Sequence, residues 1–271
     1  LAVGSNLTIA RGTGSFTTMD LRDQSTCTVG GYLLIGGYSA SVGTVSVRDG
    51  AALTVAGYVE AGTSSGTGRL ALAGGRLVAK SVKGGLGGWS EFVANGGTLC
   101  ASNISASVKL LENFDLAELG ASGLTLDSAG YDVTVGQAFA DASGADGLFL
   151  KTGAGTLSAS NSAHALTVIA QGGLRVLDAS ATFGRALVVT NQTSLSLAGA
   201  TTNLTVGSLT LGEPGAAATV YLDTGYCITV TNSGGLALNA CGLFFGAAGV
   251  NGTYTPFRCA GAVDPSVLSH L

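Results

Sequence analysis

The sequence from Leu148 to Leu177, LFLKTGAGTLSASNSAHALTVIAQGGLRVL, consists of short alternating segments separated by turns rich in Gly, Asn and Ser. The alternating segments are Thr156–Ala159, Leu166–Val168 and Leu174–Val176. Successive side chains of a β-strand point to opposite faces, so a period of two predicts strands and not helix. Short strands joined by tight turns are typical of one coil of a β-solenoid, and we expect this stretch to form such a coil.

The same stretch resembles the autotransporter-associated β-strand repeat of bacterial surface proteins. That repeat begins with Leu and Lys followed by Gly-x-Gly-x-Leu, continues through a polar turn with Asn, and ends in Thr-x-Val and Gly-x-Leu-x-Val strands. The matching residues are Leu150, Lys151, Gly153, Gly155, Leu157, Asn161, Thr167, Gly173, Leu174 and Val176. The preceding segment Gly123–Val135, GLTLDSAGYDVTV, resembles the sequence that commonly comes before this repeat. The resemblance implies a bacterial surface solenoid.

Internal repeats extend the pattern toward the N-terminus. Met19–Val29 aligns with Val45–Val55 at an offset of 26 residues, and Arg69–Leu77 aligns with Glu91–Leu99 at an offset of 22. Spacings in this range are expected for solenoid repeats. This Gly-rich half also resembles repeats in surface proteins of the PEP-CTERM and type V secretion kind, and Gly242–Thr255 resembles their closing coil.

These repeats predict one all-β domain over residues 1–271, a right-handed parallel β-helix of about a dozen coils of 20 to 26 residues. The hexapeptide Gly130–Val135 recurs as Gly225–Val230, which indicates that the later half repeats the same unit. Residues 108–119 depart from the pattern because charge rises and Gly disappears, so we expect an insertion or a short helix there. Residues 242–271 are expected to close the rod.

The composition excludes several classes of protein. With 46% hydrophobic and only 10% charged residues, the chain is too apolar and too weakly charged for a disordered protein. Its formal net charge is −4 and its Lys and Arg residues are scattered, so no nucleic acid partner is expected. Residues 186–212 carry no charge, but Thr and Asn interrupt them, so no membrane-spanning helix is expected.

The five cysteines lack Cys-x-x-Cys spacing, which argues against a zinc site, and we expect no metal or cofactor. Disulfides formed in an oxidising compartment are the alternative. Cys27 aligns with an inward position of the next repeat and should be buried. Cys241 and Cys259 bracket the final coil and are candidates for a disulfide. Cys100 and Cys227 should point outward and are candidates for a free or intermolecular thiol.

One charged cluster is repeated. Asp20, Asp23 and Arg22 are followed one repeat later by Arg48 and Asp49. Paired carboxylates could serve a carbohydrate-cleaving site, since that chemistry needs an acid and a base. A solvated ladder of charges is favoured because the Arg-Asp pair recurs at one corner of successive coils.

The remaining polar positions are expected to lie on the surface. Lys151 and His164 are interpreted as a turn and a surface position of the main repeat. Asn-x-Ser/Thr triplets make five asparagines candidates for glycosylation: Asn6, Asn103, Asn191, Asn203 and Asn251.

No catalytic motif is recognised, and no Gly-x-Ser-x-Gly elbow is present. A solenoid without capping segments leaves open strand edges, which can pair with another chain. We therefore expect a non-enzymatic protein, secreted to the bacterial surface or beyond. It would act as a stalk or passenger, or as a filament subunit stacking end to end on copies of itself, and surface glycans or a host surface are the other partners considered. The alternative is a β-helix that binds or cleaves polysaccharide.

Overall fold

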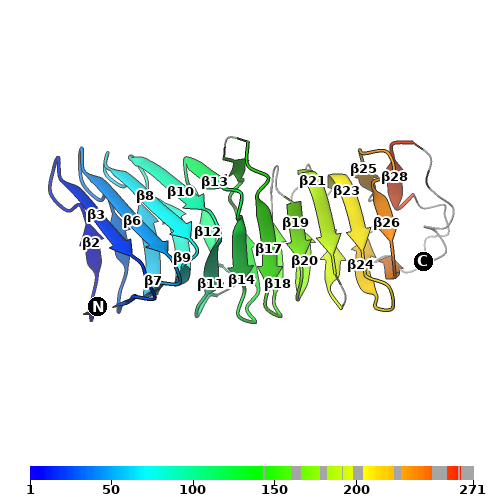
Figure 1. The fold of residues 1–271 in the computed structure, drawn as a ribbon, viewed down its shortest axis with the longest axis horizontal. Helices are drawn as coiled ribbons and strands as arrows, with labels where there is room; N and C mark the ends of the chain where they lie inside the picture. Colours follow the sequence, from blue (N-terminus) through cyan, green and yellow to red (C-terminus); the bar gives the residue numbers. More distant parts are fainter. Residues whose placement is uncertain are drawn as a thin grey trace.

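The protein is an elongated stack of parallel β-strands, with β2 (Leu7–Ile9) near one end and β28 (Phe257–Cys259) near the other (Figure 1). This computed structural model describes residues 1–105, 107–142, 144–159, 166–177, 182–190, 192–197, 204–222, 227–245, 255–261 and 263. Within these ranges the chain is all-β, and every pairing between named strands is parallel, which confirms the predicted parallel β-solenoid. In the same ranges no helix is long and apolar enough to cross a membrane.

Successive strand segments enter three columns in turn as the chain winds along the rod. The first column contains β1 (Ala2–Val3), β4 (Thr26–Val29), the first halves of β7 (Ala52–Ala61) and β9 (Arg76–Gly84), β11 (Gly97–Ala101), β14 (Leu124–Asp127), β17 (Leu148–Thr152), β19 (Leu166–Ile169), the second halves of β21 (Thr182–Val189) and β23 (Leu204–Leu211), and β26 (Leu236–Leu238).

The second column contains β2 (Leu7–Ile9), β5 (Leu33–Ile35), the second halves of β7 and β9, β12 (Leu111–Glu112), β15 (Val133–Val135), β18 (Thr156–Ala159), β20 (Gly173–Val176), β22 (Ser194–Ser196), β24 (Ala218–Leu222) and β27 (Cys241–Phe245).

The third column contains β3 (Phe16–Leu21), β6 (Val42–Arg48), β8 (Thr67–Ala73), β10 (Trp89–Ala94), β13 (Leu116–Leu119) and β16 (Ala140–Asp141), and nearer the C-terminus the first halves of β21 and β23, β25 (Ile228–Val230) and β28 (Phe257–Cys259).

The internal repeats predicted the register of the early coils residue by residue. Met19 pairs with Val45 and Arg69 pairs with Glu91, at the offsets expected from the sequence. Later turns are less regular, because Lys151 pairs with Ile169 only 18 residues on. Turns such as the one from Leu99 to Leu126 take 27 residues, so the described stack has fewer turns than the dozen expected.

The core is the inside of the rod, where inward residues of the columns meet. Strand β6 alternates between half-buried and buried residues along its whole length. Leu53, Leu77, Leu99 and Leu126 follow one another in the first column, and all four are fully buried. Burial of each such side chain contributes about 1.5–3 kcal/mol, so the stacked ladder of leucines is a main source of stability.

Glycine is required where adjacent coils meet at tight corners. Gly36 has a φ of +64°, and a Cβ there would lie 1.9 Å from the Thr67 carbonyl oxygen of the next coil. Gly62 repeats this arrangement against Trp89, with a φ of +71° and a distance of 2.1 Å. Any other residue at these corners would be strained and would push the coils apart.

Residues 108–119 form part of the stack, and the expected short helix is wrong. Leu111 pairs with Val82 on one side and Val135 on the other, while Ala117 and Leu119 turn inward from β13. The charge that suggested an insertion belongs to outward positions of strands, including Glu112 and Glu118.

The two similar hexapeptides occupy different columns, so they are not equivalent parts of one unit. Val133–Val135 forms β15 in the second column, whereas Ile228–Val230 forms β25 in the third. The similarity therefore reflects the alternation of buried and half-buried residues that both short strands share, and not a common position in the coil. In the expected closing coil, β27 pairs with β24 and β28 pairs with β25. Residues 246–254, 262 and 264–271 lie outside the described residues.

Candidate functional site

The repeated charged cluster forms a ladder between adjacent coils, as expected. Arg48 on β6 donates from Nε to Asp20 Oδ1 (2.9 Å) and from Nη2 to Oδ2 (2.6 Å), so the pair is bidentate. Arg22 donates to the same carboxylate. The pKa of Asp20 is lowered, first by the hydrogen bond from Arg48. Asp23 and Asp49 occupy turns with φ values of 55° and 53°, and Asp49 Oδ2 lies 3.9 Å from the Nε of Arg48.

Lys151 is fully buried, and the interpretation of this residue as a turn position on the surface is wrong. It takes an inward position of β17, between Leu126 and Ile169 of the neighbouring coils. Its stem therefore packs where the other coils place an aliphatic side chain. The inward position of Lys151 could have been predicted from the sequence, because Phe149 and Lys151 are two residues apart on a strand and share a face.

The ammonium of Lys151 holds three turns of chain together. Nζ donates to the carbonyl oxygens of Thr152 (2.8 Å), Gly153 (2.7 Å) and Gln171 (3.1 Å), and to Ser128 Oγ (3.1 Å). Burial lowers the pKa of Lys151 to about 8, although the nearby carboxylates of Asp127 and Asp132 act in the opposite direction. Lys151 thus connects β17 to the coils on both sides through buried hydrogen bonds, and this arrangement is here called the clamp.

The cysteines are all free thiols, so the predicted Cys241–Cys259 disulfide is not present in the structure. Cys241 lies on β27 opposite Ala218, whereas Cys259 lies on β28 opposite Val230, in another column. Cys27 points into the core opposite Leu53, as expected.

Cys100 and Cys227 are free thiols, one of the two alternatives considered for them, but both are buried. Cys100 does face away from the apolar core, but Arg76 and Asp127 from the coils on either side cover its sulfur at 2.9 and 3.5 Å. Cys227 precedes a strand of the third column, and its expected direction came from the hexapeptide alignment across columns.

Two candidate glycosylation residues, Asn6 and Asn103, are described and exposed. The Oδ1 of Asn6 accepts a hydrogen bond from the backbone N–H of Tyr32. His164 and the candidates Asn191, Asn203 and Asn251 lie outside the described residues.

A groove of about 430 Å³, here called the tyrosine groove, lies on the outer face of the second column. Its lining includes Tyr58, Lys80, Lys83, Lys109 and Glu112. Lys109 pairs with Glu112 at 3.1 Å, and Lys83 pairs with Glu60 at 3.5 Å. Lys80 makes no ion pair with a described residue, so it leaves the groove with a net positive charge.

The two faces of the Tyr58 ring are occupied. On one side Tyr32 of the preceding coil stacks on it, with ring centroids 5.1 Å apart and planes within 5°. On the other side Lys83 of the following coil places Nζ 4.8 Å from the ring centroid. The three residues are stacked along the rod, and such stacks stabilise the pairing of coils.

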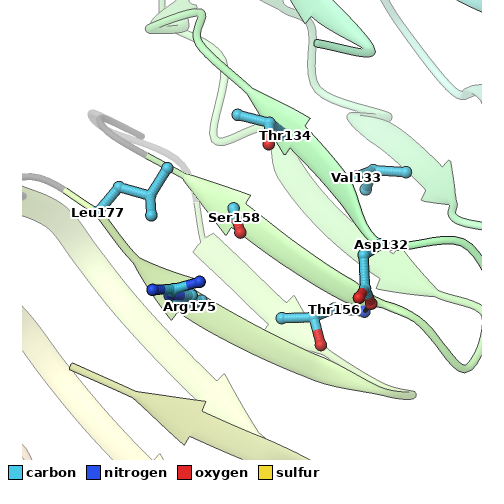
Figure 2. Close-up of a pocket in the computed structure, with 7 residues that line it drawn as sticks. All are labelled: Asp132, Val133, Thr134, Thr156, Ser158, Arg175 and Leu177. Carbon is cyan, nitrogen blue, oxygen red and sulfur yellow. Dashed lines mark hydrogen bonds between the residues drawn. The ribbon is translucent and has the colours of Figure 1, made fainter. Parts of the chain in front are cut away.

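A second groove of about 330 Å³, here called the arginine groove, is lined by residues on and beside β15, β18 and β20 (Figure 2). Ser158 and Arg175 pair as neighbours on β18 and β20, and Thr134 precedes them on β15. Asp132 accepts a hydrogen bond from the Thr156 N–H (2.8 Å) at the edge of the groove. Arg175 is exposed and makes no ion pair with any residue in the described ranges.

These grooves were not predicted from the sequence, because each is built from residues about one coil apart. The outward row continues from Arg175 through Ser196 to Tyr221, which stacks on Phe244 of the next coil at 5.5 Å. The internal repeats could have indicated which outward residues lie next to one another, since they align outward positions as well as inward ones.

The described residues contain no group of three or more His, Cys, Asp or Glu side chains arranged to hold a metal ion. Comparison with protein-family models, with curated proteins and with solved structures finds no match to this chain.

Proposed function

We propose that this chain is a non-enzymatic structural rod of the bacterial surface or extracellular space, a stalk or passenger domain or the subunit of a filament. The observation that carries the proposal is the continuous parallel ladder with one contiguous core along the described rod. Stacked coils extend along one axis, because each coil contacts only the coils on either side of it. The resemblance to surface-protein repeats supports the extracellular location.

End-to-end stacking would pair the first and last described strands of the three columns. Among the described strands, β1, β2 and β3 are the first of the three columns, and Phe16 on β3 is 78% exposed. Among the described strands β26, β27 and β28 present the opposite edge, in the same order of columns. A parallel edge can accept a further coil, and a head-to-tail contact that does not close builds a filament.

Electron microscopy of the purified chain tests this function. We expect isolated rods, or fibres whose axial repeat equals the rod length, and no release of sugars from pectin-like polymers. Monodisperse particles that hydrolyse or eliminate such polymers would favour the rival class, a polysaccharide-cleaving β-helix. That chemistry would require a convergent acid and base.

A further inference from the structure

The arginine groove contains a carboxylate and a guanidinium that do not neutralise each other. Asp132 and Arg175 both line this groove, and Figure 2 shows the two side chains apart from one another. Neither side chain forms an ion pair with any residue that the structure describes. Together they contribute no net charge, but Asp132 offers acceptor oxygens and Arg175 offers N–H donors.

Hydroxyl groups and one apolar side chain complete the lining of the groove. Thr134, Thr156 and Ser158 carry hydroxyls, each of which can donate or accept a hydrogen bond. The hydrogen bond from the Thr156 N–H to Asp132 Oδ1 holds the carboxylate at the edge of the groove. Leu177 is 42% exposed and gives the groove an apolar wall. A ligand that suits this lining has donors, acceptors and an apolar surface, and carries no net charge.

The outward row that begins in the groove leads to exposed aromatic rings. Arg175 pairs with Ser196 on the next coil, and Ser196 pairs with Tyr221 on the coil after it. Two steps of about 4.8 Å therefore place Tyr221 about 10 Å from Arg175 along the rod axis. Tyr221 is 46% exposed and stacks on Phe244, which is 55% exposed. One straight row thus presents polar groups at one end and aromatic rings at the other.

We propose that this row binds a neutral, extended polysaccharide along the rod axis, with one sugar in the arginine groove and another packed against Tyr221. Sugar hydroxyls donate to a carboxylate and accept from a guanidinium, whereas the C–H faces of a sugar ring are apolar and pack on aromatic rings. Because the row is straight, it suits an extended β-1,4-linked chain better than a helical α-1,4-linked chain. The proposal rests on the proposed extracellular role, where such polymers occur.

The charges of the groove disfavour other linear polymers. An acidic polysaccharide would bring its carboxylates or sulfates next to Asp132, which lines the same groove as Arg175. DNA carries a phosphate charge about every 1.7 Å of duplex and is bound by dense arrays of Lys and Arg. A neutral polymer meets neither difficulty.

Calorimetry of the purified chain with cellohexaose, maltohexaose and hexagalacturonate tests the proposal. Cellohexaose should bind more tightly than the other two. Its affinity should change less than about threefold between about 0.02 and about 0.3 M NaCl, because a neutral ligand has no charge to screen. Glucose should bind more weakly than cellohexaose, because a single sugar cannot span the distance of about 10 Å from Arg175 to Tyr221.

Variants of the row assign the contacts. Asp132→Asn and Arg175→Gln should each weaken cellohexaose binding about three- to tenfold, because each replaces a charged hydrogen-bonding group by a neutral one. The Asn side chain keeps an oxygen that can accept from the Thr156 N–H. Tyr221→Ser should remove most of the advantage of cellohexaose over glucose, because it deletes the aromatic ring.

Arg11→Gln and Tyr38→Ser are the matched controls, because Arg11 is an exposed cation and Tyr38 a 42% exposed aromatic residue, both outside the groove and the row. Each should leave affinity within about twofold, as expected for a distant site. The proposal is overturned if cellohexaose does not bind, if maltohexaose or hexagalacturonate binds as tightly, or if the controls weaken binding as much as the row variants. Circular dichroism checks that each variant is folded. The assay needs no fibres, so failure to bind and failure to assemble are separate results.

Discussion

The Nζ of Lys151 lies 3.1 Å from the Oγ of Ser128 on the preceding coil, and both side chains are buried. The same ammonium reaches the Gln171 carbonyl of the following coil, so one side chain ties three levels of the rod together. A buried cation is costly unless it is hydrogen-bonded, and here each Nζ contact is to a neutral oxygen atom. The stability of the coils around β17 should therefore depend on the Lys151 ammonium.

Replacement of Lys151 by Met keeps most of the stem and removes the ammonium. The carbonyls of Gly153 and Gln171 then lose a buried donor, and we expect the free energy of unfolding to fall by about 1–3 kcal/mol. Urea denaturation followed by circular dichroism measures this. Lys83→Met, at a half-buried outward position, should change stability by less than about 1 kcal/mol. Equal effects of the two variants would contradict the clamp.

The pH dependence of stability follows from the same residue. The pKa of Lys151 is about 8 in the folded chain and 10.5 as a free side chain, so the unfolded state binds more protons between these values. Stability should therefore rise with pH across this window, by at most about 3 kcal/mol. Because thiols also titrate there, the test is the difference between wild type and Lys151→Met at each pH. A difference that is constant from pH 8 to 10.5 would show that Lys151 is not shifted.

Acid should weaken the first coils through Asp20. Its pKa lies below the ordinary value because Arg48 and Arg22 stabilise the carboxylate, so the stabilisation is present above that ordinary value and is lost as pH falls through the folded pKa. Asp20→Asn should lower the melting temperature at neutral pH. The difference in melting temperature between wild type and this variant should become smaller in acid. A gap that widens in acid would contradict this account.

The burial of the thiols predicts slow alkylation of the folded protein. Burial raises the pKa of Cys100 to about 11, and burial also raises the pKa of Cys227. Since the thiolate is the reactive form, iodoacetamide at pH 8 should modify both far more slowly than in urea. Cys259 is less buried and should react before them. Mass spectrometry of timed samples identifies each site, and rapid labelling of Cys100 in the folded chain would contradict the packing of Arg76 and Asp127 over it.

The sequence was sufficient for the fold because the inward positions repeat with the coil. The offset that aligns Cys27 with Leu53 is the offset of the β4–β7 pairing, so alternation and repeat length together predicted the register. The prediction failed at Lys151, where a charged residue takes an inward position and is satisfied by carbonyls that only the folded corner brings together. It failed at Cys227 because short strands of different columns have similar sequences.

The grooves were not predicted from the sequence. Each depends on outward side chains of adjacent coils, which the repeat offsets align but do not by themselves show to form a groove. Tyr58 and Lys83 are separated by one turn of the rod, and their contact follows only once Tyr58 is known to pair with Ser81. Lys80 and Arg175 are 95 residues apart in the chain but lie on one face. No pattern of spacing in the sequence connects them.

The measurement that tests the central proposal most directly is electron microscopy of the purified chain, combined with an assay for sugar release on the same sample. The account predicts uniform rods, alone or joined end to end into fibres with a repeat of one rod length, and no released sugar. Compact, monodisperse particles that break down an acidic polysaccharide would contradict it.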